Sequence, residues 1–162
     1  MADPVFFVDA VALLENCLFM PGVRETTRES LLVTMVASIC EVYPVLAYPD
    51  VLASVLERER VRATGTPEGV AFPHGKYAGS SGVYAVVATA PHGIDFGAGE
   101  CMRCQIVVLT VSSAYRADGH LHFLSYMARR LRAPHVRAKI IRARSKAGFV
   151  KALQHSYDES HQ

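Results

Sequence analysis

Two apolar runs rich in β-branched residues place the strongest constraint on how this chain can fold. Residues 83–88 read Val-Tyr-Ala-Val-Val-Ala, and residues 106–111 read Ile-Val-Val-Leu-Thr-Val. Runs of this length and composition are typical of buried strands. Buried strands need other elements to cover them, so the rest of the chain has to supply that cover.

Helix start signals stand before and after the two runs. The clearest is Thr26 with Glu29 three residues on, a capping box in which side chains satisfy free backbone amides. This helix should end at Tyr43, because the residue before a proline is pushed out of helical geometry. Further helices are expected to begin at Val8, Asp50, Asp118, Pro134 and Ser145.

Helices that enclose a central run of strands predict an α/β sandwich. The chain has 162 residues, of which 51% are hydrophobic, enough for one domain with a sizeable core. We expect a single domain over residues 1–162, with a core from about 15 to 153 and a polar tail at 154–162. In the helix from Asp118, the positions expected to face inward are Leu121, Leu124, Met127 and Leu131.

Composition and charge exclude several functional classes. The net charge of +2 is too small to argue for nucleic acid. No run reaches the about 18 consecutive apolar residues of a membrane helix, and the first residues lack the features of a secretory signal. The four cysteines are too scattered for a disulfide framework. We therefore expect a cytoplasmic protein with reduced thiols.

His74 is the first candidate for chemistry. It follows the apolar run 70–72 and stands between Pro73, which fixes the backbone, and Gly75, which leaves room beside the ring. A neutral histidine in this setting can attack through one ring nitrogen while the protein holds the other. The alternative is a turn histidine that only hydrogen-bonds to the backbone.

His120 is the second candidate, in the first turn of the helix expected from Asp118. Free amides and the helix dipole favour an anion there, and the dipole disfavours a charged ring. A neutral His120 could still donate one N–H to a phosphate, although it could also be an ordinary surface histidine. A metal pair with His122 is not expected, because side chains two residues apart on a helix diverge.

Two further patterns are ambiguous. Arg58 lies in a run of alternating charges, usually a solvated helix face, and would matter only if the fold pointed it at His74. Cys101 and Cys104 form a lone CxxC, with only His92 nearby as a third zinc ligand. Incidental thiols are the favoured interpretation, with a zinc-binding interaction module as the alternative, so neither metal nor cofactor is expected.

Two blocks of the sequence carry a family resemblance. The first is Leu-Glu-Arg-Glu at 56–59, followed at 64–76 by Thr-Gly-x-x-x-Gly-Val-Ala-Phe-Pro-His-Gly-Lys. The second is residues 119–131, which begin Gly-His-Leu-His. Together they resemble the fructose/mannitol-type EIIA domains of the bacterial phosphotransferase system, and most of all the nitrogen-regulatory branch. The similarity covers about residues 15–153.

The resemblance implies a mixed β-sheet flanked by helices and the function of a phosphocarrier. His74 matches the family's phosphorylated histidine, and His120 matches the second histidine, which helps to hold the phosphate. Arg58 and Thr64 match positions near that site. Phe72 departs from the pattern, because it stands where the family usually has an aliphatic residue.

The partners that the resemblance implies are proteins. A phosphorylated HPr-like carrier would donate the phosphoryl group. The chain would then act as a regulator that responds to its own phosphorylation, or would pass the group to an EIIB domain during fructose/mannitol-type uptake. The two sequence blocks favour the regulatory role. Neither nucleic acid nor membrane insertion is expected.

Overall fold

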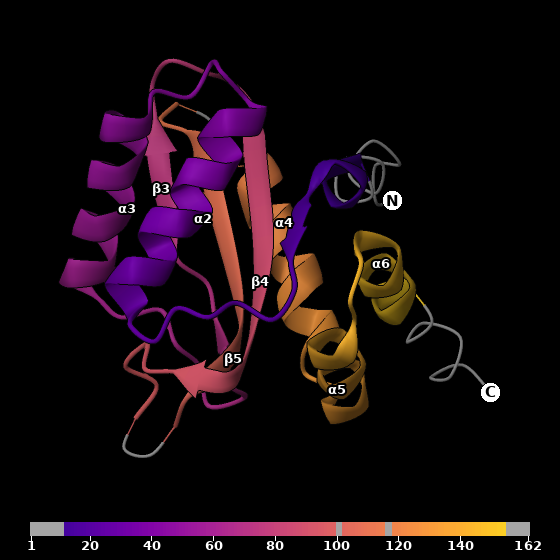
Figure 1. Cartoon of the computed structure of the whole chain (residues 1–162). Helices are drawn as coiled ribbons and strands as arrows, with labels where there is room; N and C mark the ends of the chain where they lie inside the picture. Colours follow the sequence, from indigo (N-terminus) through magenta and orange to yellow (C-terminus); the bar gives the residue numbers. More distant parts are fainter. Residues whose placement is uncertain (1–11, 100–101, 116–117, 155–162) are drawn as a thin grey trace.

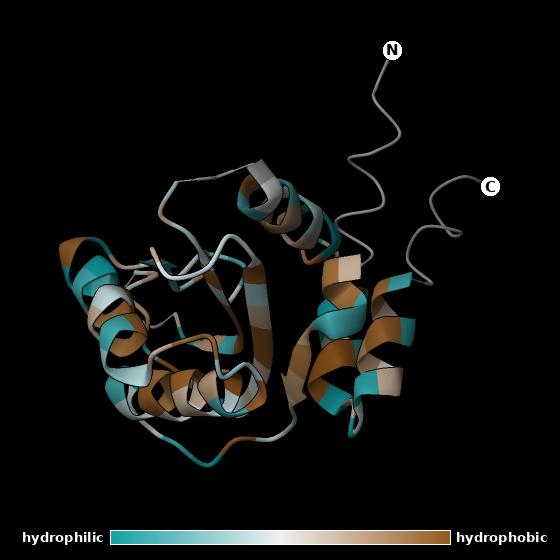
Figure 2. Ribbon diagram, turned by 90° about the horizontal axis from the view of Figure 1, so that it is seen from above, coloured by the Kyte–Doolittle hydropathy of each residue, from teal (hydrophilic) through white to brown (hydrophobic). Residues whose placement is uncertain are grey.

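A β-sheet lies between two layers of helices in the computed structural model, which describes residues 12–99, 102–115 and 118–154 (Figure 1). Helices α2 and α3 cover one face of the sheet, and α4, α5 and α6 lie on the other (Figure 2). The helices are α2 (Arg28–Val42), α3 (Tyr48–Val61), α4 (Asp118–Arg130), α5 (Pro134–Arg142) and α6 (Lys146–Gln154). The predicted α/β sandwich is therefore confirmed.

The sheet has five strands and is mixed. Its long central strands, β4 and β5, are antiparallel, whereas β1 pairs parallel to β4, and β2 and β3 pair parallel to β5. The strands are β1 (Leu18–Met20), β2 (Val70–Ala71), β3 (His74–Tyr77), β4 (Val83–Ile94) and β5 (Cys104–Ser113). Both predicted strands are present and extend beyond the apolar runs that indicated them.

Strands β2 and β3 follow the same side of β5 in one continuous register. Ala71 pairs with Val107, and His74 pairs with Thr110, so the offset between the two segments does not change. Pro73, which lies between them, has no N–H to donate, but its carbonyl accepts the N–H of Thr110 at 3.2 Å. The segment thus fixes where His74 lies along β5.

Alternate residues of the central strands fill two separate cores. Val86 and Ala88 of β4 pack with α2 and α3, whereas Ala85 and Val87 pack with α4, α5 and α6. This alternation is the ordinary consequence of a two-residue side-chain period in a sheet covered on both faces. No helix in the described ranges is long and apolar enough to cross a membrane.

Two helix starts differ from the prediction. Thr27, not Thr26, is the N-cap of α2, because its hydroxyl accepts the N–H of Ser30 at 3.2 Å. Glu29 instead forms an ion pair with Arg28 at 3.3 Å. Both threonines can cap, and the start at residue 28 makes Ser30 the third helical residue, the position that an N-cap side chain reaches.

Helix α3 also begins before the predicted cap. It starts at Tyr48, with Pro49 in the first turn and Asp50 inside the helix rather than at its cap. Proline suits that turn because the N–H it lacks would have had no partner there, and an acid in the first turn interacts favourably with the helix dipole. The expected start at Val8 lies outside the described residues, although residues 12–16 are helical.

The starts of the C-terminal helices agree with the prediction. Helix α4 begins at Asp118 and α5 at Pro134, and the Ser145 hydroxyl accepts the N–H of Gly148 at 3.2 Å at the start of α6. Leu121 is wrong as a core residue, because it is 61% exposed and Phe123 is buried in its place. The buried face of α4 therefore runs through Phe123 and Met127.

Candidate active site

His74 is held by the carbonyl of a residue two positions earlier. Its Nδ1 lies 3.1 Å from the carbonyl oxygen of Phe72. A carbonyl can only accept, so Nδ1 carries the proton and Nε2 keeps its lone pair. The contact with this carbonyl leaves Nε2 as the nucleophilic atom.

Arg58 reaches His74 from α3. A role for Arg58 was expected only if the fold pointed it at His74, and it does. Its Nε donates to Nε2 of His74 at 3.2 Å, and its Nη1 donates to the carbonyl of Arg62 at 2.8 Å. The approach depends on Gly75, where a Cβ atom would lie 2.7 Å from Cγ2 of Val55 on α3. The room that this glycine provides is therefore taken by α3.

His120 comes from the first turn of α4 and faces His74. The two rings have centroids 5.3 Å apart and planes inclined at 53°. Nε2 of His120 lies 2.7 Å from Oγ1 of Thr110, the β5 residue in register with His74. His120 is only 6% exposed, so it is not the surface histidine of the alternative interpretation.

Burial keeps the His120 ring neutral. Burial, with smaller contributions from the charges of His74 and Lys76, lowers the pKa of His120 to about 4. A neutral ring agrees with the expectation, but the main cause is burial rather than the helix dipole. With Nε2 engaged by Thr110, Nδ1 is the nitrogen left to face a ligand.

Positive groups dominate the surroundings of the two rings. Arg58 contacts His74 directly, and Lys76 follows it on β3 at the two-residue spacing that returns to the same face. Arginine and lysine beside neutral imidazoles favour a doubly charged phosphoryl group, which accepts charge-assisted hydrogen bonds. The arrangement can therefore place an attacking nitrogen beside donors for phosphate oxygens.

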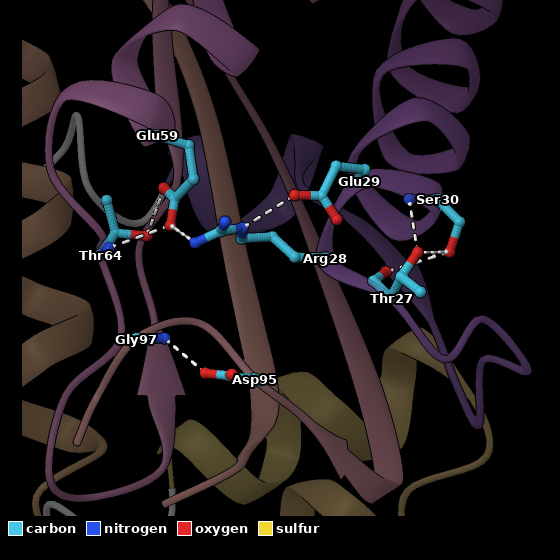
Figure 3. Close-up of polar contacts among 8 residues, drawn as sticks. All are labelled: Thr27, Arg28, Glu29, Ser30, Glu59, Thr64, Asp95 and Gly97. Atoms are coloured by element: carbon cyan, nitrogen blue, oxygen red, sulfur yellow. Dashed lines mark hydrogen bonds and ion pairs between the residues drawn. The ribbon is translucent and has the colours of Figure 1, made fainter. Parts of the chain in front are cut away.

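Thr64 forms hydrogen bonds with Glu59 and Phe72 rather than with either imidazole ring. Its N–H and hydroxyl donate to the carboxylate of Glu59 at 3.0 and 2.8 Å (Figure 3). Its carbonyl accepts the N–H of Phe72 at 3.2 Å. The fold thus brings three of the four predicted site residues together: His74, His120 and Arg58. Thr64 is connected to His74 only indirectly, through its hydrogen bond with Phe72.

Three participants were not identified from the sequence. Thr110 is buried within an apolar strand run. A polar residue in such a run needs a hydrogen-bond partner for its hydroxyl, and this was the feature of the sequence that could have indicated a polar neighbour. The Phe72 carbonyl could not be found from residue type, because every residue has one. Lys76 belongs to the first family block, but no role was predicted for it from the sequence.

The cysteine motif gives no metal site within the described part of the chain. Cys104 is fully buried, and burial raises the pKa of its thiol to about 11. His92 donates through Nε2 to the carbonyl of Glu25 at 2.8 Å. No group of three or more His, Cys, Asp or Glu side chains among the described residues could hold a metal ion, and Cys101 lies outside them.

Comparison with known families and proteins gives two sequence matches. Residues 13–156 match the family described as "Phosphoenolpyruvate-dependent sugar phosphotransferase system, EIIA 2". A curated relative from Haloferax volcanii, the "PTS system fructose-specific EIIA component", is 33% identical over 95 residues. That alignment covers 59% of this chain and 62% of the relative, so the chain spans about three fifths of the relative's length.

Solved structures share the fold at low sequence identity. The nitrogen regulatory protein IIA-Ntr from Neisseria meningitidis superposes with a TM-score of 0.78 at 19% identity, covering 88% of this chain and 99% of that one. The IIAMtl–phosphorylated IIBMtl complex from Escherichia coli contains a chain with a TM-score of 0.71 at 18% identity, covering 87% and 95%. At this identity the likeness concerns the fold.

Proposed function

Since the chain belongs to the EIIA 2 family of the phosphoenolpyruvate-dependent sugar phosphotransferase system, we propose that it is a phosphocarrier whose His74 takes up a phosphoryl group. The observation that carries the proposal is the pair of hydrogen bonds on the His74 ring. The Phe72 carbonyl accepts a hydrogen bond from Nδ1–H, so the lone pair of Nε2 is directed toward Arg58. The donor would be a phosphorylated HPr-like protein.

In the proposed transfer, Nε2 of His74 attacks the phosphorus of a phosphohistidine on the donor. A nitrogen–phosphorus bond forms at Nε2 as the donor's nitrogen–phosphorus bond breaks, and the electron pair of the broken bond returns to the donor ring. The positive charge that develops on the His74 ring is stabilised through Nδ1–H by the Phe72 carbonyl. Such transfer passes through a loose state that needs positioning and charge stabilisation more than covalent help.

The other residues act on the phosphoryl oxygens. Arg58 has to leave Nε2 when phosphorus arrives, and its guanidinium then lies beside the new phosphate group. We assign the Nδ1–H tautomer to His120, with the Thr110 hydroxyl donating to Nε2, so that Nδ1–H donates to a phosphoryl oxygen. Because the ring is neutral, it does not compete as a strong cation. These donors are arranged before the reaction, the condition for effective electrostatic stabilisation.

Labelling tests the proposal. The chain is incubated with the general phosphotransferase components and labelled phosphoenolpyruvate, and incorporation is compared with that of His74→Ala. We expect label on the wild type and none on His74→Ala. His92→Ala, a histidine bonded to Glu25 away from this site, is the matched control and should be labelled like the wild type. Equal labelling of His74→Ala would contradict the proposal.

The destination of the phosphoryl group gives two candidate roles. A role as a regulator governed by phosphorylation is supported by the Pro-His-Gly-Lys and His-Leu-His blocks, which resemble the nitrogen branch. Transfer to an EIIB domain is supported by the fructose-specific name of the curated relative. Incubating the phosphorylated chain with a fructose-type EIIB separates them, since transfer moves the label from His74 onto the EIIB. Capture of partners with His74→Ala and His74→Asp tests the regulatory role.

A further inference from the structure

Glu59 is a buried carboxylate beside the site that the proposed transfer does not use. It is 4% exposed, although its neighbour in the same charged run, Glu57, has a side chain 60% exposed and pairs with Arg60. Burying a carboxylate is costly unless hydrogen bonds and charges compensate it. The contacts that compensate the burial of the Glu59 carboxylate therefore indicate its role in the structure.

Those contacts join three segments of the chain. Oε1 accepts the N–H of Thr64 at 3.0 Å, and Oε2 accepts its hydroxyl at 2.8 Å. Nη1 of Arg28, at the start of α2, lies 3.9 Å from Oε1 (Figure 3). The carboxylate thus fixes the turn after α3 to the end of that helix, with Arg28 supplying the opposite charge.

The turn fixed by Glu59 leads to the His74 ring through two further hydrogen bonds. The carbonyl of Thr64 accepts the N–H of Phe72 at 3.2 Å. The carbonyl of Phe72 in turn accepts a hydrogen bond from Nδ1–H of His74, with 3.1 Å between nitrogen and oxygen. A displacement of Thr64 would therefore shift the peptide of Phe72, and with it the acceptor that selects the ring tautomer.

Neighbouring residues of α3 consequently act on opposite nitrogens of one imidazole. Arg58 contacts Nε2 directly at 3.2 Å, whereas Glu59 acts on Nδ1 through Thr64 and Phe72. Both act from the same helical turn, so the orientation of the ring is set relative to α3 from both sides.

The turn has other attachments, which lets the effect of Glu59 be separated from folding. Gly65 donates to the carbonyl of Phe96 at 3.0 Å, and Thr66 donates to that of Val70 at 2.9 Å. Strand β2 also remains paired with β5. Loss of the carboxylate should therefore loosen the link from Thr64 to Phe72 while the sheet stays intact.

We propose that Glu59 is a positioning residue that holds His74 in the Nδ1–H tautomer by fixing Thr64 and, through it, the Phe72 carbonyl. The consequence for phosphoryl transfer rests on the proposed function, but the effect on the tautomer does not. Glutamine has the same size as glutamate, but its amide nitrogen cannot accept the second hydrogen bond from Thr64. Glu59→Gln therefore keeps the packing and breaks half of the attachment.

The test compares Glu59→Gln with Glu57→Gln, its exposed neighbour two residues away. Nitrogen-15 NMR of the ring nitrogens, above the titration range of histidine, measures the tautomer of His74. We expect the Nδ1–H form in the wild type and in Glu57→Gln, and a mixture with the Nε2–H form in Glu59→Gln. The labelling rate at saturating donor should fall about tenfold for Glu59→Gln alone, the size expected for about 1.4 kcal/mol.

A second pair of variants tests the proposal if Glu59→Gln does not fold. Thr64→Val removes the hydroxyl bond and should also give a tautomer mixture, whereas Thr64→Ser keeps the hydroxyl and should restore the wild-type form. A pure Nδ1–H signal in Glu59→Gln, or in Thr64→Val if the former does not fold, overturns the proposal. Failure of the wild type to become labelled would contradict the phosphocarrier function and leave the tautomer result interpretable.

Discussion

Nε of Arg58 donates its hydrogen to Nε2 of His74 at 3.2 Å, on the same lone pair that would attack phosphorus. Arg58 thus occupies the nucleophilic atom while no phosphoryl group is present. The bond from the Arg58 guanidinium to the neutral ring has one charged partner and is worth about 1.5–3 kcal/mol net, whereas a bond to a phosphate oxygen has two charged partners, so the exchange is favourable.

The first prediction concerns this exchange. Arg58→Gln should slow labelling of His74 about 100-fold, because it removes a charged donor that serves the transition state. Arg58→Lys should recover part of the rate, since lysine keeps the charge but not the planar fork. Single-turnover labelling measures both, with Arg60→Gln, an exposed partner of Glu57, as the control. A wild-type rate for Arg58→Gln would exclude this role.

The second prediction concerns the accessory histidine. His120→Asn should leave phosphorylation on His74 but slow it by about 100- to 1,000-fold, the usual effect of removing one donor aimed at developing charge. Labelling followed by site mapping measures the rate and the position together. His122→Asn, on the exposed side of α4, serves as the comparison and should behave like the wild type. Label on any other residue of His120→Asn would be inconsistent with its helper role.

A third prediction follows from the buried state of His120. Its folded pKa of about 4 lies below the ordinary histidine value near 6.5, so the unfolded chain binds the proton first as pH falls. The free energy of unfolding should therefore decrease between about pH 6.5 and 4. Urea midpoints at several pH values should show a smaller decrease for His120→Gln. An equal decrease in both proteins would contradict the assignment, and NMR titration of the ring reports the pKa directly.

The fourth prediction tests the close approach of α3 to β3. Gly75→Ala should destabilise the fold by about 1–3 kcal/mol, because its Cβ would lie 2.7 Å from Val55 Cγ2 and 3.1 Å from the Val55 backbone nitrogen. Gly148→Ala in α6 meets only ordinary contacts at 3.5 Å and should be neutral or stabilising by up to about 1 kcal/mol. Urea unfolding compares the two, and equal effects would show that α3 can move aside.

The fifth prediction distinguishes the two threonines before α2. Thr27→Ala should cost about 1 kcal/mol, because it removes the acceptor of the Ser30 N–H. Thr26→Ala should change the free energy of unfolding by no more than about 0.5 kcal/mol, as expected for a surface position without a cap contact. A larger loss of unfolding free energy for Thr26→Ala than for Thr27→Ala would support Thr26 as the N-cap, as the capping box predicted.

The sequence was informative where one local pattern decides the outcome. The β-branched composition of 83–88 and 106–111 identified both central strands, and the proline at 134 and the serine at 145 marked helix starts. Where two local solutions compete, as for the adjacent threonines before α2, the pattern could not decide. The inward face of α4 was misjudged because Leu121 and Phe123 both fit an apolar stripe.

For the site, the sequence identified the residues whose chemistry is distinctive. His74 and His120 were singled out as imidazoles in suitable settings, and the fold brings them together with Arg58. The groups that hold them were not predicted, because a backbone carbonyl at Phe72 and a threonine within a strand have no distinctive signature. Such partners are decided by strand register, which depends on contacts between distant parts of the chain.

Thr110 has a consequence for motion within the domain. Its main-chain N–H is bonded to Pro73, next to His74, and its hydroxyl is bonded to His120, so one residue of β5 is attached to both imidazole-bearing segments. Fluctuations that slide β5 against the helical layers would carry both rings in the same direction. The distance between the His74 and His120 rings should therefore change little when the surrounding fold fluctuates, even though the two histidines lie far apart in the chain.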